Sequence, residues 1–165
     1  MADVHDAFAG AGCENVTAVM QSGNILFETA ARSCGRTMED VRRKLRRLLG
    51  EEPQVMVRTT REIADLIAAA PFAAYEPSPR IKFYVSFFND PPRKIPPLPL
   101  VSVEEALEAI AVTRRHVLVV SRPKRPRFFG LPNNFIEDQL GVPATTRNWS
   151  TLVRIAEAAR RRRAG

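Results

Sequence analysis

The sequence predicts an α+β protein built from two ferredoxin-like (split βαβ) halves in tandem, the first half lacking its opening strand. Three observations lead to this fold class. Helical and strand patterns alternate along the chain, one stretch of the first half recurs in the second, and a hydrophobic content of 45% suffices for a packed core. We expect residues 1–70 to form the incomplete N-terminal half with a connecting helix, and residues 71–165 to form the C-terminal half with a C-terminal helix.

The N-terminal half has the pattern α-β-β-α-β, followed by the connecting helix. The expected elements are a helix over 2–12, strands over 15–20 and 25–29, a helix over 37–50, a strand over 54–58 and a helix over 59–70. Thr37 and Thr59 are the expected N-caps, and Glu62 completes a capping box with Thr59. Between the first two strands, "QSGN" (21–24) favours a tight hairpin turn, although its glycine and asparagine also suit a backbone that contacts a ligand.

The C-terminal half has the pattern β-α-β-β-α, and "PATTR" (143–147) supplies the last strand if it is extended. The other expected elements are a strand over 80–88, a proline-rich connection over 89–100, a helix over 102–110, two strands around "TRR" (113–115), an irregular basic loop over 122–132, a helix over 132–141 and a last helix from about Asn148. Ser102 and Glu105 are spaced as a second capping box, and Gly141 is placed to end its helix.

An internal similarity supports the duplication. "LLGEEPQVMVRTTREIADLI" (48–67) and "QLGVPATTRNWSTLVRI" (139–155) each pass from a leucine-glycine helix end through a proline and an extended run to an arginine and a helix start. The strand missing from the first half leaves a sheet position whose backbone groups need partners. A coding start placed too late, a reorganised sheet, or a strand donated by another chain would each account for this, and the last would make a homodimer through the unpaired position.

The stretches "VMQSGNILFE", "VMVRTTREIADLIAAAPF" and, most specifically, "LPNNFIEDQLGVPATTRNW" resemble the bacterial family catalogued as domain of unknown function 1697. The resemblance covers nearly the whole chain. It implies a duplicated ferredoxin-like α+β fold and assigns no activity. Two departures stand out: relatives begin with an apolar strand and a turn containing Arg-Gly and Asn-Gly, which are absent here, and the loop before "LPNNF" is unusually basic.

The charge of the chain favours acidic partners. The net charge is +7 and the isoelectric point about 10.2, as expected for a protein that binds nucleic acid or a phosphorylated ligand. Only four of the basic residues are lysines, and the arginine excess that remains also arises from a GC-rich genome without selection for binding. Net charge alone therefore does not decide between these interpretations.

Other features bound the class of protein. No apolar run is long enough for a membrane span, so we expect no membrane association, and the N-terminal stretch does not match a secretory signal. Cys13 and Cys34 lack paired spacing and are typical of reduced thiols in a cytoplasmic protein. No spacing indicates a metal site or a cofactor, and His5 and His116 are isolated in the sequence.

The stretch "TTRNW" (145–149) is the first candidate site. Thr145, Thr146, Arg147 and Asn148 lie at a helix start, where backbone N–H groups and the helix dipole favour an anion, and Arg58 occupies the matching place in the first half. In the alternative, structural interpretation, the asparagine caps the helix, the threonines satisfy the turn, the arginine pairs with an acid and the tryptophan packs in the core. The internal similarity favours this second interpretation.

The second candidate is a nucleic-acid-binding surface. The residues expected to form it are Arg122, Lys124, Arg125 and Arg127, beside Phe128 and Phe129, with further charge on the helix at 42–47 and in the tail at 160–163. A solvated helix face and tail are the alternative. In the strand over 80–88, Phe83 and Phe87 share one face and Tyr84 and Phe88 the other, so the face not packed on helices is either a stacking platform or the interface between the halves.

The sequence therefore predicts a non-enzymatic protein that binds an anionic partner, either nucleic acid or a phosphorylated small molecule. The alternative is an uncharacterised enzyme with a site between the two halves, which spatial assembly of residues far apart in sequence would have to create.

Overall fold

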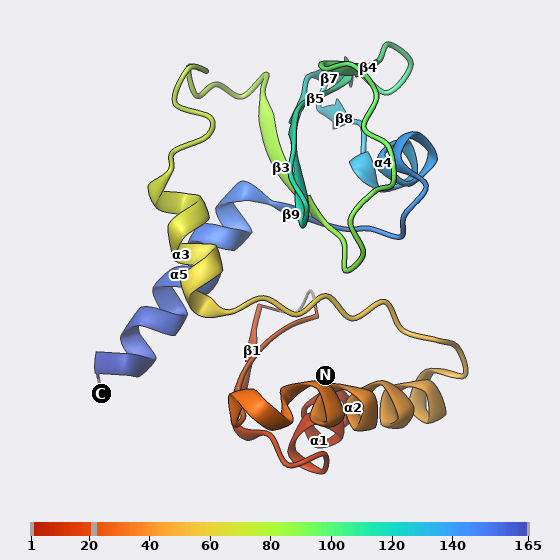
Figure 1. The fold of residues 1–165 in the computed structure, drawn as a ribbon. Helices are drawn as coiled ribbons and strands as arrows, with labels where there is room; N and C mark the ends of the chain where they lie inside the picture. Colours follow the sequence, from red (N-terminus) through yellow and green to blue (C-terminus); the bar gives the residue numbers. More distant parts are fainter. Residues whose placement is uncertain (1, 21–22, 165) are drawn as a thin grey trace. The chain divides into compact units, whose positions relative to one another are not determined.

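The computed structural model describes residues 2–20 and 23–164, with side chains described up to residue 162. The chain divides into two compact units: residues up to Val55 together with the segment from Glu157 form the first, and Met56–Ala156 form the second. Figure 1 labels most of the helices and strands of both. The class is α+β, as predicted. The tandem ferredoxin-like arrangement and the division after residue 70 stay predictions.

The first unit has a two-stranded antiparallel sheet and two main helices. Its elements are α1 (Ala2–Ala9), β1 (Glu14–Val19), β2 (Asn24–Glu28), a 3-10 turn η1 (Ala31–Ser33) and α2 (Cys34–Leu49). Gly23 has a φ of 71° in the turn between the strands, which explains the glycine; Gln21 and Ser22 of the expected turn lie outside the described residues. Phe8 and Phe27 contact each other with ring centroids 5.3 Å apart.

Two expectations for residues 1–70 are wrong. Thr37 does not cap a helix: α2 begins at Cys34, and Thr37 is buried within it. Residues 54–58 form no strand. The Val57 carbonyl accepts hydrogen bonds from the side chains of Arg58 and Arg115 at 2.7 and 3.0 Å, which satisfy it without a neighbouring strand.

The second unit contains a five-stranded antiparallel sheet in the order β4-β5-β6-β3-β9. Its strands are β3 (Lys82–Phe87), β4 (Leu100–Ser102), β5 (Leu107–Val112), β6 (His116–Ser121) and β9 (Thr145–Asn148). The four strands β5-β6-β3-β9 have the neighbour order of a split βαβ unit. The connection from β3 to β5 differs from that unit, because it contains the proline-rich segment and β4 in place of a helix.

The helix expected over 102–110 is therefore wrong. The Glu105 N–H does donate to the Ser102 Oγ at 3.2 Å, the bond that a helix cap makes, but here it closes a turn between β4 and β5. Beyond the turn, Leu107 and Ala109 are buried at alternate positions, which is the periodicity of a strand. Pairing with β4 and β6 on both sides outweighs the helical preference of the segment.

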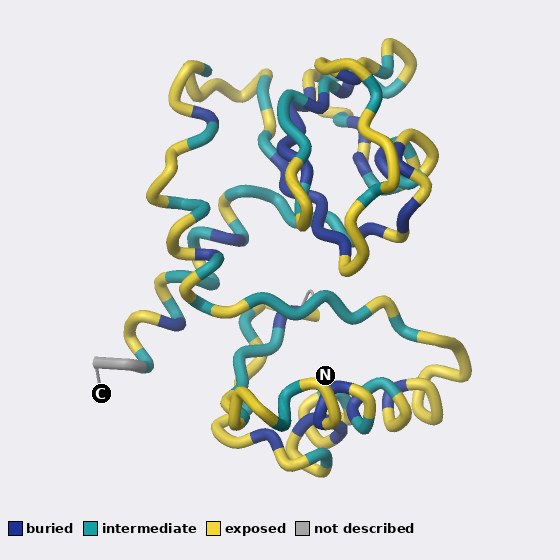
Figure 2. Tube along the Cα trace, in the orientation of Figure 1, coloured by how far each residue is buried: buried dark blue, intermediate teal, exposed yellow. Residues whose placement is uncertain are grey.

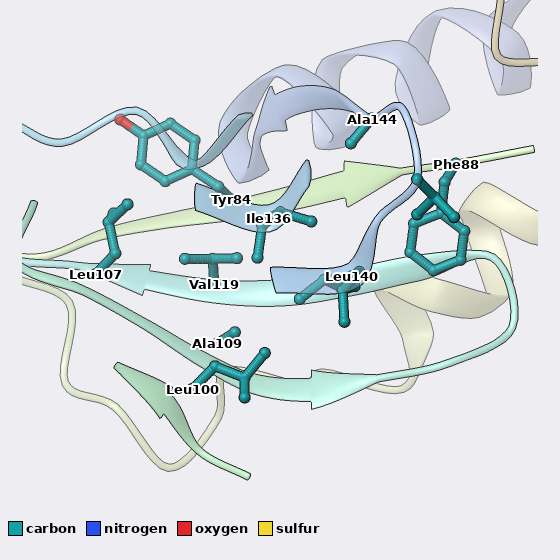
Figure 3. Packing of buried hydrophobic residues seen from close by; sticks show 11 residues of the cluster. Tyr84, Phe88, Leu100, Leu107, Ala109, Val119, Ile136, Leu140 and Ala144 are labelled. Carbon is teal, nitrogen blue, oxygen red and sulfur yellow. The ribbon is translucent and has the colours of Figure 1, made fainter. Parts of the chain in front are cut away.

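Helices cover both faces of this sheet. On one face, α4 (Pro132–Leu140) places Ile136 and Leu140 over Leu107, Ala109 and Val119 of the strands (Figure 3). On the other face, α3 (Thr60–Ala68) and α5 (Trp149–Ala164) contribute further residues. The second cluster consists chiefly of Ile63, Phe72, Val85, Phe87, Leu118, Val120 and Leu152. Figure 2 shows the buried positions following the strands.

The central strand β3 is thus buried on both faces by residues of its own unit. Tyr84 and Phe88 lie in the first cluster, and Val85 and Phe87 in the second, with Phe83 packed beside them. The stacking platform is wrong, since α3 and α5 cover that face; α3 lies within residues 1–70, so the alternative of a contact with the expected N-terminal half is not contradicted.

The remaining elements agree with the sequence more closely. Thr59 caps α3 in a complete capping box with Glu62, Gly141 ends α4 in the left-handed conformation, and "PATTR" continues into the strand β9. The loop over 122–132 is more regular than expected: β7 (Pro123–Arg125) and β8 (Phe128–Phe129) form a small antiparallel hairpin. Among the described residues, no helix has the length and apolar character that crossing a membrane requires.

Candidate functional site

The predicted anion-site residues Thr145–Asn148 form the edge strand β9, paired with β3. Thr145 lies opposite Phe87, Arg147 opposite Val85, and Thr146 opposite Ser86. Because side chains alternate along a strand, Thr145 and Arg147 face the α3–α5 side of the sheet, and Thr146 faces α4. The side chains of the predicted anion site are therefore divided between the two faces of the sheet.

Thr146 belongs to a polar network under α4. Its Oγ1 donates to the Asn133 Oδ1 at 2.9 Å and lies 2.7 Å from the Ser86 Oγ. The Asn133 Nδ2 donates to the Ala144 carbonyl at 2.9 Å, and the Ala144 N–H donates to the Glu137 carboxylate at 2.7 Å. Ser86 is fully buried. These bonds join α4 to β9 and β3 through side chains whose donors and acceptors are matched.

Asn148 caps α5, because its Oδ1 accepts from the Ser150 N–H at 3.0 Å and from the Ser150 hydroxyl at 2.9 Å. The Arg147 Nη1 donates to the Thr146 carbonyl at 2.9 Å, and burial lowers the pKa of the Arg147 guanidinium. The Trp149 ring packs edge-on against Phe72, with centroids 5.1 Å apart. The asparagine cap and the packing of the tryptophan match the structural interpretation of the stretch, whereas the bond of Arg147 to a main-chain carbonyl differs from the expected pairing with an acid.

Arg58 lies at the end of β3, where the β5–β6 turn also lies. Its Nη1 donates to the Val57 carbonyl at 2.7 Å, and its Nη2 donates to the carbonyls of Phe88 and Arg115 at 2.6 and 2.7 Å. Its Cζ lies 5.1 Å from the centroid of the Phe87 ring. Burial and the charge of Arg115 lower the pKa of Arg58 to about 10, so the guanidinium stays protonated at pH 7.

Three residues beside Arg58 were not predicted as site residues. Arg115 pairs with Glu62 at 3.4 Å between Nε and Oε1, and His116 packs against the Phe87 ring. Burial, and then the charge of Arg58, lower the pKa of His116. The capping box indicated where Glu62 would lie, but no local pattern places Arg115 or His116 beside Arg58.

This arrangement engages the guanidinium groups of Arg58 and Arg115 in bonds within the protein. Arg58 is bonded to three main-chain carbonyls and Arg115 to a carbonyl and a carboxylate, so both guanidiniums first hold the segment before α3 on the sheet. Anion binding at Arg58 and Thr145–Asn148 stays a prediction. Within residues 2–20 and 23–164, no cluster of three His, Cys, Asp or Glu side chains is arranged to hold a metal ion.

The basic hairpin of β7 and β8 has a different character. Arg122 pairs with Glu108 at 3.0 Å, and Lys124 pairs with Glu105. Arg125 and Arg127 are exposed and have no carboxylate partner among the described residues. The hairpin therefore combines two neutralised cations, which attach it to the sheet, with two whose charge faces solvent.

Aromatic rings accompany these charges. The Arg125 Cζ lies 5.8 Å from the centroid of Phe128, and the Lys82 Nζ lies 4.3 Å from that of Phe129. Phe128 is 68% exposed, and every other aromatic side chain in the described residues is buried or half-buried. Gly130 explains how the hairpin stays in place: a Cβ there would lie 2.1 Å from the Glu105 carbonyl oxygen, so only glycine permits this close approach to the β4–β5 turn.

Comparison with known proteins yields one match. A family model described as "Protein of unknown function (DUF1697)" matches residues 1–118. No curated protein and no solved structure matches the chain.

Proposed function

We propose that this chain, which belongs to the DUF1697 family of proteins of unknown function, binds single-stranded nucleic acid through the hairpin of β7 and β8. Membership of the family assigns no activity, so the proposal is argued from the structure. The observation that carries the proposal is the exposed Phe128 ring, with the guanidinium of Arg125 beside it. An exposed ring next to unpaired cations is the combination that single-strand-binding proteins use.

The ring supplies the contact with bases. An exposed phenylalanine gains nothing from the core, whereas a base stacked on such a ring contributes about 1–3 kcal/mol. Phe129, the next residue, is half-buried and lies against Lys82, so it anchors the hairpin and leaves Phe128 as the stacking surface. One ring accounts for the stacking of one base or one base step.

The unpaired cations supply the contact with phosphates. Arg125 and Arg127 form no ion pair in the described part of the chain. The planar guanidinium group binds a phosphate through two parallel hydrogen bonds. Arg127 has a φ of 68°, which places it at the tip of the hairpin between β7 and β8. A sugar-phosphate backbone that follows the hairpin meets both side chains.

A single strand fits this surface better than a duplex. Bases in a duplex are stacked on one another and do not offer a face to Phe128, whereas an unpaired base does. The strands β7 and β8 have only three and two residues, too short for a ribbon that reads a major groove. We therefore expect little sequence preference and a preference for unpaired nucleotides.

The test is fluorescence anisotropy of a labelled oligothymidylate of about 12 nucleotides, a length within the site sizes of single-strand-binding domains. We expect F128A to weaken binding by about 5- to 150-fold, the loss of one stacked base. The control variant is L131A, which removes another exposed apolar side chain next to the hairpin. Equal affinities of F128A and L131A, or no binding by the wild type, would refute the proposal.

The charge contribution is measured separately, from the salt dependence of the same titration. R125Q is compared with R154Q, which removes one positive charge from an exposed position on α5. Losing one phosphate contact should reduce the slope of log K against log salt by about 0.7 for a single strand. The same reduction in both variants contradicts a contact at Arg125, because general attraction by net charge then explains the binding.

A further inference from the structure

The first compact unit contains a cavity of about 280 Å³ where the end of α1 meets α2. It is lined by Gly10, Ala11, Asp40, Arg43, Lys44 and Arg47. We propose that this cavity binds a small phosphate-bearing ligand, a second site that is independent of the hairpin. The proposal rests on three properties of the lining: its charge, the space that one glycine leaves, and its size.

The lining carries more positive than negative charge. Asp40 is the one carboxylate and pairs with Arg43 at 3.1 Å, so the charges of Lys44 and Arg47 are not balanced by any carboxylate lining the cavity. Arg43 and Arg47 are four residues apart on one helix face, where like charges destabilise each other. An anion bound between them removes that repulsion and pairs with the excess charge.

The remaining cations of α2 do not share this cavity, which shows that the lining is a particular part of the helix surface. Arg46 pairs with Glu52, and the half-buried Arg42 lies outside the lining. Five cations in the run from Arg42 to Arg47 therefore divide into three that face the cavity and two that do not.

Gly10 leaves room for the ammonium group of Lys44. A Cβ at Gly10 would lie 3.3 Å from the Lys44 Nζ and 3.0 Å from the Asp6 carbonyl oxygen, both tighter than ordinary contacts. The lysine is thus held against the end of α1, where the helix dipole favours a positive charge. Lys44 is exposed, and it lines the cavity with its ammonium group beside Gly10.

The chemistry of the lining limits the class of ligand. Guanidinium forks and an ammonium group match the several acceptor oxygens of a phosphate. The lining contains no aromatic side chain that stacks on a base, and its volume lies at the lower end of ligand pockets. Inorganic phosphate, pyrophosphate or the phosphate ester of a small polyol fits these conditions, whereas recognition of a nucleobase does not.

The test is isothermal titration calorimetry of the full chain with inorganic pyrophosphate at low salt. We expect saturable binding, and we expect R47Q and K44Q each to weaken it by about tenfold, the loss of one charge-assisted contact. The control is R42Q, which removes the same charge from the same helix outside the cavity. Circular dichroism of each variant confirms that the helices are retained.

Two results would overturn the proposal. No saturable heat with the wild type removes the site, and equal weakening by R42Q and R47Q shows that net charge alone attracts the ligand. A competition experiment identifies whether the phosphate belongs to a small ligand or to a nucleic acid. Oligothymidylate is added to the F128A variant with pyrophosphate bound, and displacement of the pyrophosphate would overturn the assignment to a small ligand. Unchanged pyrophosphate binding by F128A is the expected result, so the outcomes for the two sites are distinguishable.

Discussion

The hydroxyl of Thr146 is expected to stabilise the second unit far more than its position on an edge strand suggests. Thr146 donates its single proton to the Asn133 Oδ1, since the Asn133 amide nitrogen is already bonded to the Ala144 carbonyl. The proton between Ser86 and Thr146 must therefore come from Ser86. T146V keeps the shape of the side chain and removes both bonds.

The magnitude follows from the burial of the two groups left behind. Ser86 is fully buried, so its orphaned hydroxyl costs about 1–3 kcal/mol, and the half-buried Asn133 oxygen adds up to about 1 kcal/mol. We expect T146V to lower the free energy of unfolding by about 1–4 kcal/mol. The matched control is T145V on the same strand, because Thr145 is also half-buried and its hydroxyl makes no hydrogen bond within the described residues. Its expected effect is within about 0.5 kcal/mol.

The assay is urea unfolding followed by the fluorescence of Trp149, whose ring packs on Phe72 in the folded unit. A second substitution gives the sharper test. S86A in the T146V background removes the orphaned hydroxyl and should restore about 1–3 kcal/mol, although S86A alone destabilises the wild type. If T146V and T145V unfold at the same urea concentration, or if S86A and T146V destabilise additively, the proposed network is refuted.

Two further predictions concern the residues around Arg58. Burial and then the charge of Arg58 lower the pKa of His116 in the folded protein, so the unfolded chain binds a proton on His116 more tightly. The contribution of neutral His116 to the free energy of unfolding is therefore full above pH 6.5. It is lost as the pH falls from there through the lowered pKa. Denaturant unfolding between pH 7.5 and pH 5 should show this loss, and H116N should reduce it; an unchanged pH dependence in H116N contradicts it. R58K keeps the positive charge but cannot bond three carbonyls with the same geometry, so we expect a loss of about 1–3 kcal/mol in thermal or urea unfolding. A variant as stable as the wild type would mean that charge alone matters there.

The sequence predicts those helices, strands and turns that are determined by residues close together in the chain. The Thr59–Glu62 capping box, the glycine end of α4 and the central strand β3 each follow from residues within a few positions of one another. Residues 102–110 form a segment whose structure is not determined by neighbouring residues alone. The bond between Ser102 and Glu105 suits a helix start and a turn equally well, and the burial of Leu107 between two neighbouring strands decides for the turn.

The candidate sites divide in the same way. The grouping of basic residues beside Phe128 could be predicted, because these residues are close in sequence, whereas the hairpin of β7 and β8 that carries them was expected as an irregular loop. The surroundings of Arg58 could not, since two of its carbonyl acceptors lie 30 and 57 residues further along the chain. A pattern that reveals an arginine at a helix start does not reveal that main-chain carbonyls occupy its donors.

The position of β3 between β6 and β9 has a consequence for the order of folding during synthesis. Its β6 partner lies nearby in the chain, but Ser86 and Thr146, which face each other across the β3–β9 pair, are 60 residues apart. A growing chain therefore presents β3 with one edge open until β9 has left the ribosome, and this edge carries the apolar residues Tyr84, Val85 and Phe87. During the interval between the two pairings, the open edge is available for association with other nascent chains.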